Sequence, residues 1–313
     1  MKALITGITG QDGSYLAEFL LSKGYEVYGL ERRVALQDQQ TRNERIKDLK
    51  VEIIPCDITN YASVFNAIQK VQPDEVYHLA SQSFVFESWI DPFQTLDTNI
   101  FGTLNVLESI KQINPKIKFY FAASSEMFGN SPSPQNELTA MNPRSPYGIS
   151  KLAGYHLTKN YRESYNMFAC SGILFNHESP RRGKEFITRK ITEFVKSLNW
   201  KDRNRVLELG NLDAKRDWGF SGDYVKVMWQ MLQQEVPEDF VIGTGETHTI
   251  KEFCEEAFGI LGLDYKDFVR VNPKFVRPAE LNELRADYSK AKEKLGFEPE
   301  IKFKELVRLM VND

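Results

Sequence analysis

The sequence predicts an α/β protein with a Rossmann-type, doubly wound parallel sheet and a smaller C-terminal α/β domain. Two observations predict this fold class. In the first half of the chain, short apolar segments alternate with segments whose apolar residues recur at helical spacing. A glycine-rich turn, residues 7–13, also joins the first apolar segment to the first helical one.

The expected elements follow one another along the chain in an order typical of a wound sheet. Strands are expected over residues 3–6, 26–30, 51–54, 75–79 and 118–122, and helices over residues 14–22, 64–71 and 104–113. Strands joined by helical crossovers run parallel, so helices should cover both faces of the sheet. Ligands bind such sheets at the carboxyl ends of the strands.

The pattern changes beyond about residue 175, where helices are expected over residues 187–198, 224–233 and 250–261. We expect residues 1–175 to form a dinucleotide-binding Rossmann domain and residues 176–313 to form mainly a substrate-binding domain. The segments of the two domains can interleave, with one later segment returning to the first sheet.

Composition and charge exclude several classes of protein. The formal net charge is −3, whereas nucleic-acid binding needs a dense basic surface, so we expect no nucleic-acid partner. No segment resembles a secretion signal or a membrane span, and we expect a cytoplasmic protein without a membrane partner. Cys56, Cys170 and Cys254 are too widely spaced to indicate a metal site or a disulfide framework, so no metal is expected.

The spacing Gly7-x-x-Gly10-x-x-Gly13 is suited to a dinucleotide. Glycines let the backbone approach a pyrophosphate, and the helix that follows offers N–H groups and partial positive charge at its N-terminus. Three glycines in a turn are common without any ligand. Their place between an apolar strand and an amphipathic helix favours the dinucleotide.

Tyr147 and Lys151 are four residues apart, which on a helix places both side chains on one face. A nearby ammonium stabilises a phenolate, so we expect Lys151 to lower the pKa of Tyr147 towards the range in which it accepts a proton from a hydroxyl group. Alone, such a pair is more often a surface feature. Combined with the glycine turn, it indicates a hydroxyl that is oxidised against a nicotinamide.

Ser124-Ser125-Glu126 follows directly on an expected strand, so these side chains should emerge at the ligand-binding edge of the sheet. A carboxylate there can remove a proton from a carbon next to a ketone, and hydroxyl groups can bind the sugar or ligand oxygens. The alternative is a helix cap, a common role of serine. If the site is catalytic, Glu126 is the residue that separates a dehydratase from an epimerase.

The chain resembles the extended short-chain dehydrogenases/reductases and, more narrowly, the GDP-mannose 4,6-dehydratase family. The resemblance is carried by residues 7–16, 142–147, 160–165, 172–183, 213–219 and 277–280. The glycine turn and residues 145–147 are shared widely in the superfamily, whereas residues 172–183 and 213–219 are much more specific.

The resemblance implies a complete set of site residues. The catalytic set is Ser124, Glu126, Tyr147 and Lys151. The cofactor site comprises Gly7, Thr9, Gly10, Gln11, Asp12, Gly13, Glu31, Arg32, Arg33, Asp57, Ile58, Leu79, Ala80, Ser81, Tyr147, Lys151, His177 and Arg182. The substrate site comprises Ser83, Glu87, Ser124, Asn176, Lys190, Arg216, Arg277 and Glu280. Arginines can make bidentate contacts to a diphosphate, and a carboxylate can accept hydrogen bonds from ribose hydroxyls.

Three positions depart from the family pattern: Ser124 replaces a threonine and keeps its hydroxyl, Phe128 replaces a tyrosine, and Phe84 replaces a histidine. Phe84 lies beside the sugar by resemblance, so the identity of the hexose stays open.

The cofactor signals conflict. Arg32 and Arg33 resemble the family's clamp for the 2′-phosphate of NADP, so we expect NADP as the cofactor. Glu31, however, stands where an acidic residue would bind the 2′-hydroxyl of NAD, so NAD stays an alternative.

The resemblance implies a nucleotide-sugar 4,6-dehydratase that converts GDP-mannose to GDP-4-keto-6-deoxymannose, with hydride removed from C4 and returned to C6. Two alternatives stay open. One is a dehydratase, C4 dehydrogenase or epimerase for another GDP-sugar, such as a GDP-heptose; the other is a non-catalytic dinucleotide sensor. The expected partners are the GDP-sugar and further copies of the chain, in a homodimer or homotetramer, although residues 34–42 depart from the family's subunit-contacting loop.

Overall fold

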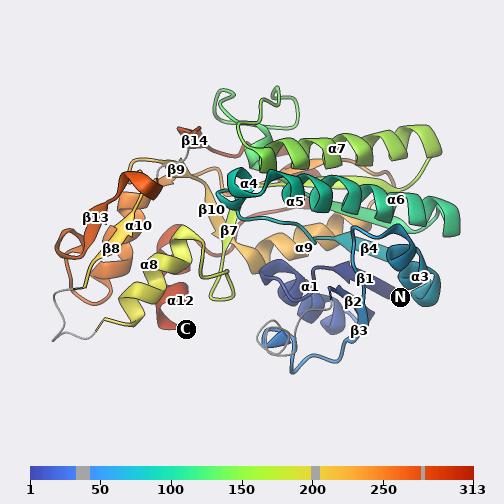
Figure 1. Ribbon diagram of the computed structural model, residues 1–313, viewed down its shortest axis with the longest axis horizontal. Helices are drawn as coiled ribbons and strands as arrows, with labels where there is room; N and C mark the ends of the chain where they lie inside the picture. Colours follow the sequence, from blue (N-terminus) through green and yellow to red (C-terminus); the bar gives the residue numbers. More distant parts are fainter. Residues whose placement is uncertain (33–42, 199–204, 276–278) are drawn as a thin grey trace.

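A parallel sheet of seven strands forms the centre of the computed structural model, which describes residues 1–32, 43–198, 205–275 and 279–313 (Figure 1). Its strands are Lys2–Thr6 (β1), Glu26–Glu31 (β2), Glu52–Pro55 (β3), Glu75–His78 (β4), Lys118–Ser124 (β5), Ala169–Leu174 (β6) and Phe240–Ile242 (β11). They lie in the order β11-β6-β5-β4-β1-β2-β3, and every neighbouring pair is parallel. All the carboxyl ends therefore meet at one edge of the sheet.

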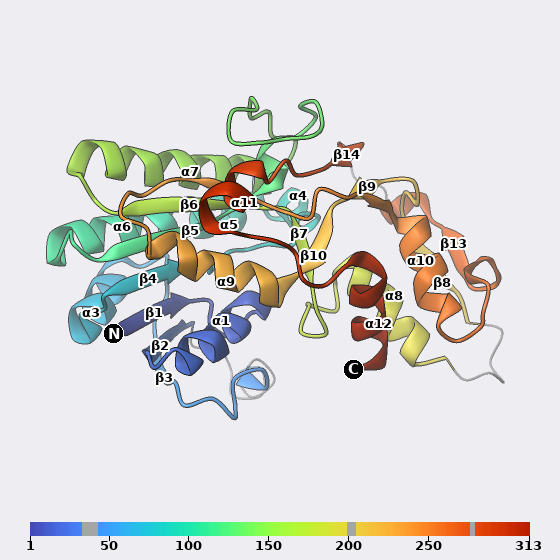
Figure 2. The same ribbon diagram turned by 180° about the vertical axis from the view of Figure 1, so that it is seen from behind.

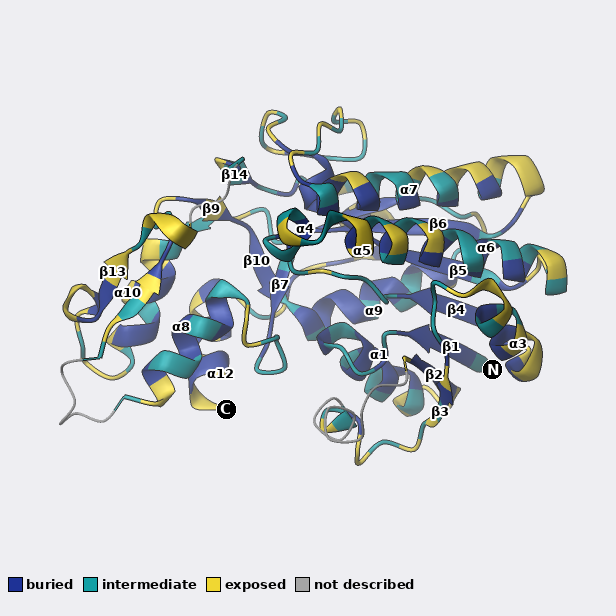
Figure 3. Ribbon diagram, viewed as in Figure 1, coloured by how far each residue is buried: buried dark blue, intermediate teal, exposed yellow. Residues whose placement is uncertain are grey.

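Helices cover both faces of this sheet (Figures 1 and 2). One face carries Tyr61–Val71 (α3), Gly102–Ile113 (α6) and Pro146–Tyr165 (α7), and the other carries Gln11–Ser22 (α1), Ser221–Leu232 (α9) and Ser289–Leu295 (α11). Successive β5 residues alternate between the two cores: Phe119 packs with the first group of helices and Tyr120 with the second. The strands are accordingly buried, and exposed residues lie mainly on the outer sides of the helices (Figure 3).

Three shorter helical segments precede α6, and one follows β5. Glu87–Ile90 (α4), Pro92–Leu96 (α5) and the π-helical turn Asp97–Phe101 (η1) run into α6, and the 3₁₀ turn Ser125–Met127 (η2) follows β5 directly. Asp91 caps α5 by accepting a hydrogen bond from the Gln94 N–H at 2.9 Å, and Pro92 occupies the first turn, where it costs no helical hydrogen bond.

Most of the remaining elements gather at one end of the molecule, on the left in Figure 1 and on the right in Figure 2, and two short strands lie between that end and the main sheet. The helices there are Ile187–Lys196 (α8), Ile250–Gly259 (α10) and Phe303–Asn312 (α12), with the 3₁₀ turns Tyr265–Asp267 (η3) and Pro273–Phe275 (η4). The small sheets are Asn176–Glu178 (β7) with Trp218–Phe220 (β10), Leu207–Leu209 (β8) with Val269–Val271 (β13), and Lys215–Arg216 (β9) between His248–Thr249 (β12) and Glu283–Leu284 (β14). A separate hydrophobic core, including Ile191, Phe253 and Leu306, holds this end together.

The predicted fold class is confirmed, and the expected strands and helices appear with shifts at their ends. The first helix begins at Gln11 rather than Ser14, because Gly10 takes the extended backbone of an N-cap. Strand β11 joins the large sheet beside β6, although its residues follow position 175. The division of the chain at residues 175 and 176 stays a prediction.

Three further findings concern the surface and the cysteines. None of the helices in the described ranges combines the length and the apolar character needed to cross a membrane. Cys56, Cys170 and Cys254 are buried and free. Within the same ranges, no three His, Cys, Asp or Glu side chains come together in a way that could hold a metal ion.

Candidate active site

A large cavity opens at the carboxyl edge of the main sheet, between the sheet and the small end of the molecule. Its volume is about 790 Å³, within the usual range for cofactor and ligand sites. The residues that follow β1 to β6 line one side, and residues of α8, β8 and β9 line the other. A cofactor held by the sheet and a substrate held by the small end would therefore meet in one space.

The glycine turn lies at this edge and approaches its neighbours too closely for side chains. Gly7 has a φ of +73°, and a Cβ there would lie 2.9 Å from the backbone of Ala80. A Cβ on Gly13 would lie 2.4 Å from the carbonyl oxygen of Gly7. Gly10 caps α1 without a side-chain hydrogen bond, and the first-turn residues Gln11, Asp12 and Gly13 line the cavity. This cradle fits the pyrophosphate of a dinucleotide.

The residues expected around the rest of the cofactor also line the cavity. Thr6 holds the β1 and β4 ends together, because its Oγ1 accepts hydrogen bonds from the N–H groups of Leu79 at 3.1 Å and Ala80 at 3.0 Å. Among the expected cofactor residues, the cavity is lined by Gly7, Thr9, Gly10, Gln11, Asp12, Gly13, Glu31, Arg32, Asp57, Ile58, Leu79, Ala80, Ser81, Tyr147, Lys151, His177 and Arg182. Arg33 lies outside the described residues.

The four expected catalytic residues come from three elements, β5, η2 and α7. Ser124 ends β5, and its Oγ accepts a hydrogen bond from the N–H of Glu126 at 3.3 Å, which starts the η2 turn. Tyr147 and Lys151 lie in the first turns of α7, where Ser145 caps the helix by accepting the Gly148 N–H at 3.0 Å. All four side chains line the cavity, and all four residues are largely buried.

Tyr147 does not have the lowered pKa that we expected. Burial raises the pKa of Tyr147 to about 12, and the negative charge of Glu126 adds to this shift. A hydrogen bond with Ser124 and the positive charge of Arg182 act in the opposite direction. The expectation failed because helical spacing gives the proximity of a cation but not the cost of burying the phenolate.

Lys151 points its amino group into the sheet. Its Nζ donates a hydrogen bond to the carbonyl oxygen of Ala122 at 2.8 Å and lies 5.8 Å from the centre of the Tyr147 ring. Burial lowers the pKa of Lys151 to about 7, so its charge is itself weakened near neutral pH. The cation expected to act on Tyr147 is thus anchored to backbone in a desolvated place.

The expected substrate residues divide into three groups. Ser83, Ser124, Asn176, Lys190, Arg216 and Glu280 line the cavity. Glu87, at the start of α4, is not among the described residues that line it. Arg277 lies outside the described residues.

Arg216 is held in place by neighbouring carbonyl and carboxylate oxygens. Its Nη1 donates to the carbonyl oxygen of Leu281 at 3.0 Å, and its Nη2 lies 3.5 Å from Glu280 Oε1. Lys190 Nζ lies 5.0 Å from the centre of the Phe275 ring. Arg216, Lys190 and Glu280, which are distant from the glycine turn in sequence, therefore line the same cavity. Two cations and a carboxylate suit a ligand with a diphosphate and a ribose.

An aromatic wall that the sequence did not reveal lines the cavity beside Arg182. The ring centres of Phe84 and Phe186 lie 5.5 Å apart with their planes nearly perpendicular, and Phe86 lies next to Phe84 at 6.4 Å. The Arg182 guanidinium lies 3.6 Å from the centre of the Phe186 ring. Phe84 was noted as a departure from the family, but no local pattern links it to Phe186, about a hundred residues later.

Arg45 was also missed. Its Nη1 donates a hydrogen bond to the carbonyl oxygen of Thr9 at 3.0 Å and so helps to hold the glycine turn in place. An isolated arginine in a charged segment gives no sequence signal for such a contact.

Comparisons with known proteins agree with this geometry. Residues 4–310 match a family model described as GDP-mannose 4,6 dehydratase. The chain is 49% identical over 321 residues to GDP-mannose 4,6 dehydratase 2 of Arabidopsis thaliana, covering 99% of this chain and 86% of that protein. It is 46% identical to GDP-mannose 4,6 dehydratase of Drosophila melanogaster, covering 99% of this chain and 85% of that protein.

The fold is likewise found among solved structures. UDP-glucose 4-epimerase of Thermus thermophilus, in complex with NAD, has a TM-score of 0.85 at 26% identity and covers 100% of this chain and 98% of its own. The family resemblance inferred from the sequence motifs is confirmed by the match over nearly the whole chain. The chain belongs to the GDP-mannose 4,6-dehydratase family.

Proposed function

We propose that this protein is a nucleotide-sugar 4,6-dehydratase that converts GDP-mannose to GDP-4-keto-6-deoxymannose and water. One observation carries the proposal: Ser124, Glu126, Tyr147 and Lys151 line the same cavity as the glycine turn. The family membership of the chain supports the choice of GDP-mannose. A bound nicotinamide dinucleotide supplies an acceptor for the C4 hydride, which is later returned to C6.

Tyr147 and Ser124 act on the C4 oxygen. The Tyr147 phenolate accepts the proton of the C4 hydroxyl as the C4–H bond breaks, and the Ser124 hydroxyl donates a hydrogen bond to the resulting ketone oxygen. The hydrogen bond between these two side chains, which lowers the pKa of Tyr147, supports a common role at the C4 oxygen. They thus form the oxidation site.

Glu126 acts on the next two carbons. The C4 ketone acidifies the C5 proton, which the Glu126 carboxylate accepts; the C5–H electron pair forms the C5–C6 double bond, and the C6–O bond breaks. The proton on Glu126 passes to the departing oxygen, so that water leaves. Return of the hydride to C6, and of the proton that Tyr147 took from the C4 hydroxyl to C5, then gives the 6-deoxy product and restores the Tyr147 phenolate. An epimerase needs no carboxylate that removes the C5 proton. The buried position of Glu126 beside Ser124 therefore favours dehydration.

We propose NADP as the cofactor. Arg32 lines the cavity at the end of β2 and is exposed, as an arginine that meets a 2′-phosphate would be. Glu31, which also lines the cavity, is the feature that would instead suit NAD. Mass spectrometry of the dinucleotide released from the purified protein separates the two: an NADP mass supports the proposal, and an NAD mass refutes it.

We also propose that the protein assembles as a homodimer or homotetramer. Phe93 on α5 is 84% exposed, and Ile90, Phe101 and Ile149 on neighbouring α4, η1 and α7 are 64%, 54% and 50% exposed. Clustered exposed apolar side chains are typical of an interface between subunits. Light scattering of Phe93→Asp should show a smaller particle than the wild type; a monomeric wild type would refute the proposal.

The two ends of the chain divide the work in this proposal. Residues 1–175 mainly bind the dinucleotide, and residues 176–313 mainly bind the GDP-sugar through Asn176, Lys190, Arg216 and Glu280. The cytoplasmic location expected from the sequence stays a prediction.

The substrate is tested by incubating the purified protein with GDP-mannose and, separately, with other GDP-sugars and with UDP-glucose. Loss of one water from GDP-mannose, without added oxidant or reductant, supports the proposal. Dehydration of another nucleotide sugar while GDP-mannose stays unchanged would refute the substrate, and unchanged masses throughout would refute the activity.

A further inference from the structure

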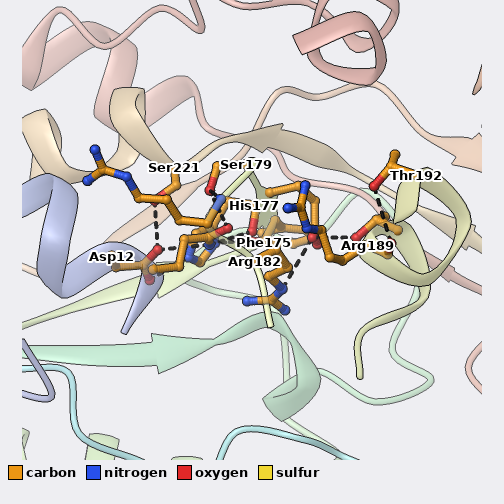
Figure 4. A network of polar contacts seen from close by, with 12 residues as sticks. Asp12, Phe175, His177, Ser179, Arg182, Arg189, Thr192 and Ser221 are labelled. Atoms are coloured by element: carbon orange, nitrogen blue, oxygen red, sulfur yellow. Dashed lines mark hydrogen bonds and ion pairs between the residues drawn. The ribbon is translucent and has the colours of Figure 1, made fainter. Parts of the chain in front are cut away.

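A buried histidine bridges the glycine turn and the segment after β6. His177 Nδ1 lies 2.7 Å from the carbonyl oxygen of Phe175, and its Nε2 lies 2.7 Å from Asp12 Oδ2 (Figure 4). The ring stacks on Tyr224 of α9 with ring centres 4.7 Å apart. His177 is 9% exposed, so water cannot readily replace these partners.

The partners of the two ring nitrogens determine where protons must be. A carbonyl oxygen only accepts hydrogen bonds, and an ionised carboxylate does the same. Both ring nitrogens therefore need a proton, which makes the ring an imidazolium. Asp12 is placed as an ionised acceptor, because its Oδ1 receives the Ser221 hydroxyl at 2.8 Å and the Gln11 amide at 3.1 Å.

His78 shows the opposite arrangement in the same protein. It is buried even more completely, at 1% exposed, but its ring nitrogens lie 2.8 Å from Thr6 Oγ1 and 3.2 Å from Thr103 Oγ1. Hydroxyl groups donate as well as accept, so a neutral ring satisfies both contacts. Burial lowers the pKa of His78 to about 3, which agrees with a neutral ring.

We propose that His177 is an imidazolium at neutral pH, and that it neutralises Asp12 and thereby makes the N-terminus of α1 able to receive the diphosphate of the dinucleotide. Asp12 lies in the first turn of α1 and lines the cavity, where a bare carboxylate would repel that diphosphate. His177 is a positioning residue in this role. The inference rests only on the dinucleotide part of the proposed function, not on any sugar.

The charges around His177 come from several elements, and they agree with this assignment. Asp12 on α1 favours the charged ring and outweighs burial and the repulsion of Arg182, so that the pKa of His177 is raised. Burial tends to raise the pKa of Asp12, but His177, Ser221 and Arg182 together hold it well below its usual range. Tyr224 contributes its ring face from α9.

The same contacts fasten the turn mechanically. Gln11 donates to the carbonyl oxygen of His177 at 3.1 Å and accepts the Ser179 hydroxyl at 2.7 Å. The glycine turn, the segment 175–179 and α9 are therefore tied at one point, and the charge of His177 lies at its centre.

The protonation state is tested by nitrogen NMR of the full chain labelled at histidine, of which the chain has four. We expect two protonated ring nitrogens for His177 at neutral pH and one for His78, with signals assigned through His177→Phe and His78→Phe. A single protonated nitrogen at His177 would overturn the proposal. This result does not depend on whether any sugar is dehydrated.

The role of the charge is tested by measuring the dissociation constant of the dinucleotide, NADP or NAD as extracted from the protein, for three variants. His177→Phe keeps an aromatic ring against Tyr224 and leaves Asp12 without its cation, so binding should weaken roughly tenfold or more. Asp12→Asn in that background removes the carboxylate and should restore much of the affinity. His156→Phe, on the outer part of α7, should bind like the wild type.

A double variant as weak as His177→Phe would overturn the charge role, because a purely structural loss is not repaired by removing a second side chain. Unchanged binding in His177→Phe would overturn it as well. Circular dichroism of each variant keeps a folding failure from being mistaken for either result, and the wild-type NMR spectrum decides the protonation state even if a variant does not fold.

Discussion

Lys151 donates a hydrogen bond to the carbonyl oxygen of Ala122 at 2.8 Å, and this contact fixes the lysine at the carboxyl end of β5, beside Ser124. The anchored amino group is buried, and its pKa falls to about 7 because the charged form loses water. Near neutral pH, Lys151 therefore carries less positive charge than an exposed lysine. Lys151 therefore contributes through its fixed position as well as through its positive charge.

Replacement of Lys151 by Met should lower turnover about 10²- to 10⁴-fold, because both the anchor and the charge near Tyr147 are lost. The measurement is kcat at neutral pH with GDP-mannose. Lys159→Met is the matched control, since Lys159 lies farther along α7 and forms an exposed pair with Glu163 at 3.8 Å. Equal rates for Lys151→Met and the wild type would contradict the assignment.

Replacement of Glu126 by Gln should abolish exchange of the C5 hydrogen with solvent and lower turnover about 10²- to 10⁴-fold, because the amide cannot accept the proton. Mass spectrometry of nucleotide sugar recovered from heavy water reports this exchange. Glu185→Gln changes another carboxylate of the cavity and should exchange normally. Normal C5 exchange in Glu126→Gln would show that another base is at work.

Replacement of Arg182 by Gln should move the acidic limb of the kcat/KM profile to higher pH. Arg182 is a cation that lowers the pKa of Tyr147, so its loss favours the protonated phenol, and more alkaline conditions are needed to form the phenolate. Arg181→Gln is the control, because Arg181 contacts Glu18 at 2.6 Å and does not line the cavity. If the acidic limb of the profile stays at the same pH in Arg182→Gln, Arg182 does not influence the ionisation of Tyr147.

Dinucleotide affinity should fall as the pH rises through the raised pKa of His177. The charged pair with Asp12 is complete below that pKa and is lost above it, when the ring releases a proton. Acidification to mildly acidic pH should not weaken binding through this pair, because the pKa of Asp12 is far below neutral. Fluorescence titration with the dinucleotide at a series of pH values measures the affinity. If His177→Phe loses affinity at alkaline pH to the same extent as the wild type, the prediction is contradicted.

Replacement of Gly13 by Ala should weaken dinucleotide binding and lower stability by about 1–3 kcal/mol, because its Cβ would lie 2.4 Å from backbone that cannot move freely. Thermal and denaturant unfolding measure the stability. Gly259→Ala is the control: nothing lies within 4 Å of its Cβ, and a gain of about 0.5–1 kcal/mol is expected. Tight binding by Gly13→Ala would argue against the cradle.

Much of the fold could be predicted from sequence because it rests on local patterns. Residues 3–5 and 119–122 alternate between the two cores on either side of the sheet, and the glycines from Gly7 to Gly13 mark the turn between β1 and α1 and the start of that helix. Strand β11 was not predicted, since three apolar residues carry no period and their pairing with β6 depends on the whole chain.

The candidate site could be predicted only where a residue follows a recognisable strand or motif. Ser124 and Tyr147 were found in this way, and they do share a cavity. Arg45 and Phe186 were missed because their contacts join distant segments. The pKa of Tyr147 was wrong in direction because burial is a property of the folded structure and not of helical spacing.

The central claim is an internal hydride transfer, and GDP-mannose carrying deuterium at C4 tests it most directly. The purified protein, with its own bound dinucleotide, is incubated with this substrate in ordinary water, and the product is examined by NMR and mass spectrometry. We predict a product that has lost one water and carries the deuterium at C6. A dehydrated product without deuterium at C6, or GDP-mannose returned unchanged by folded protein, would contradict the account.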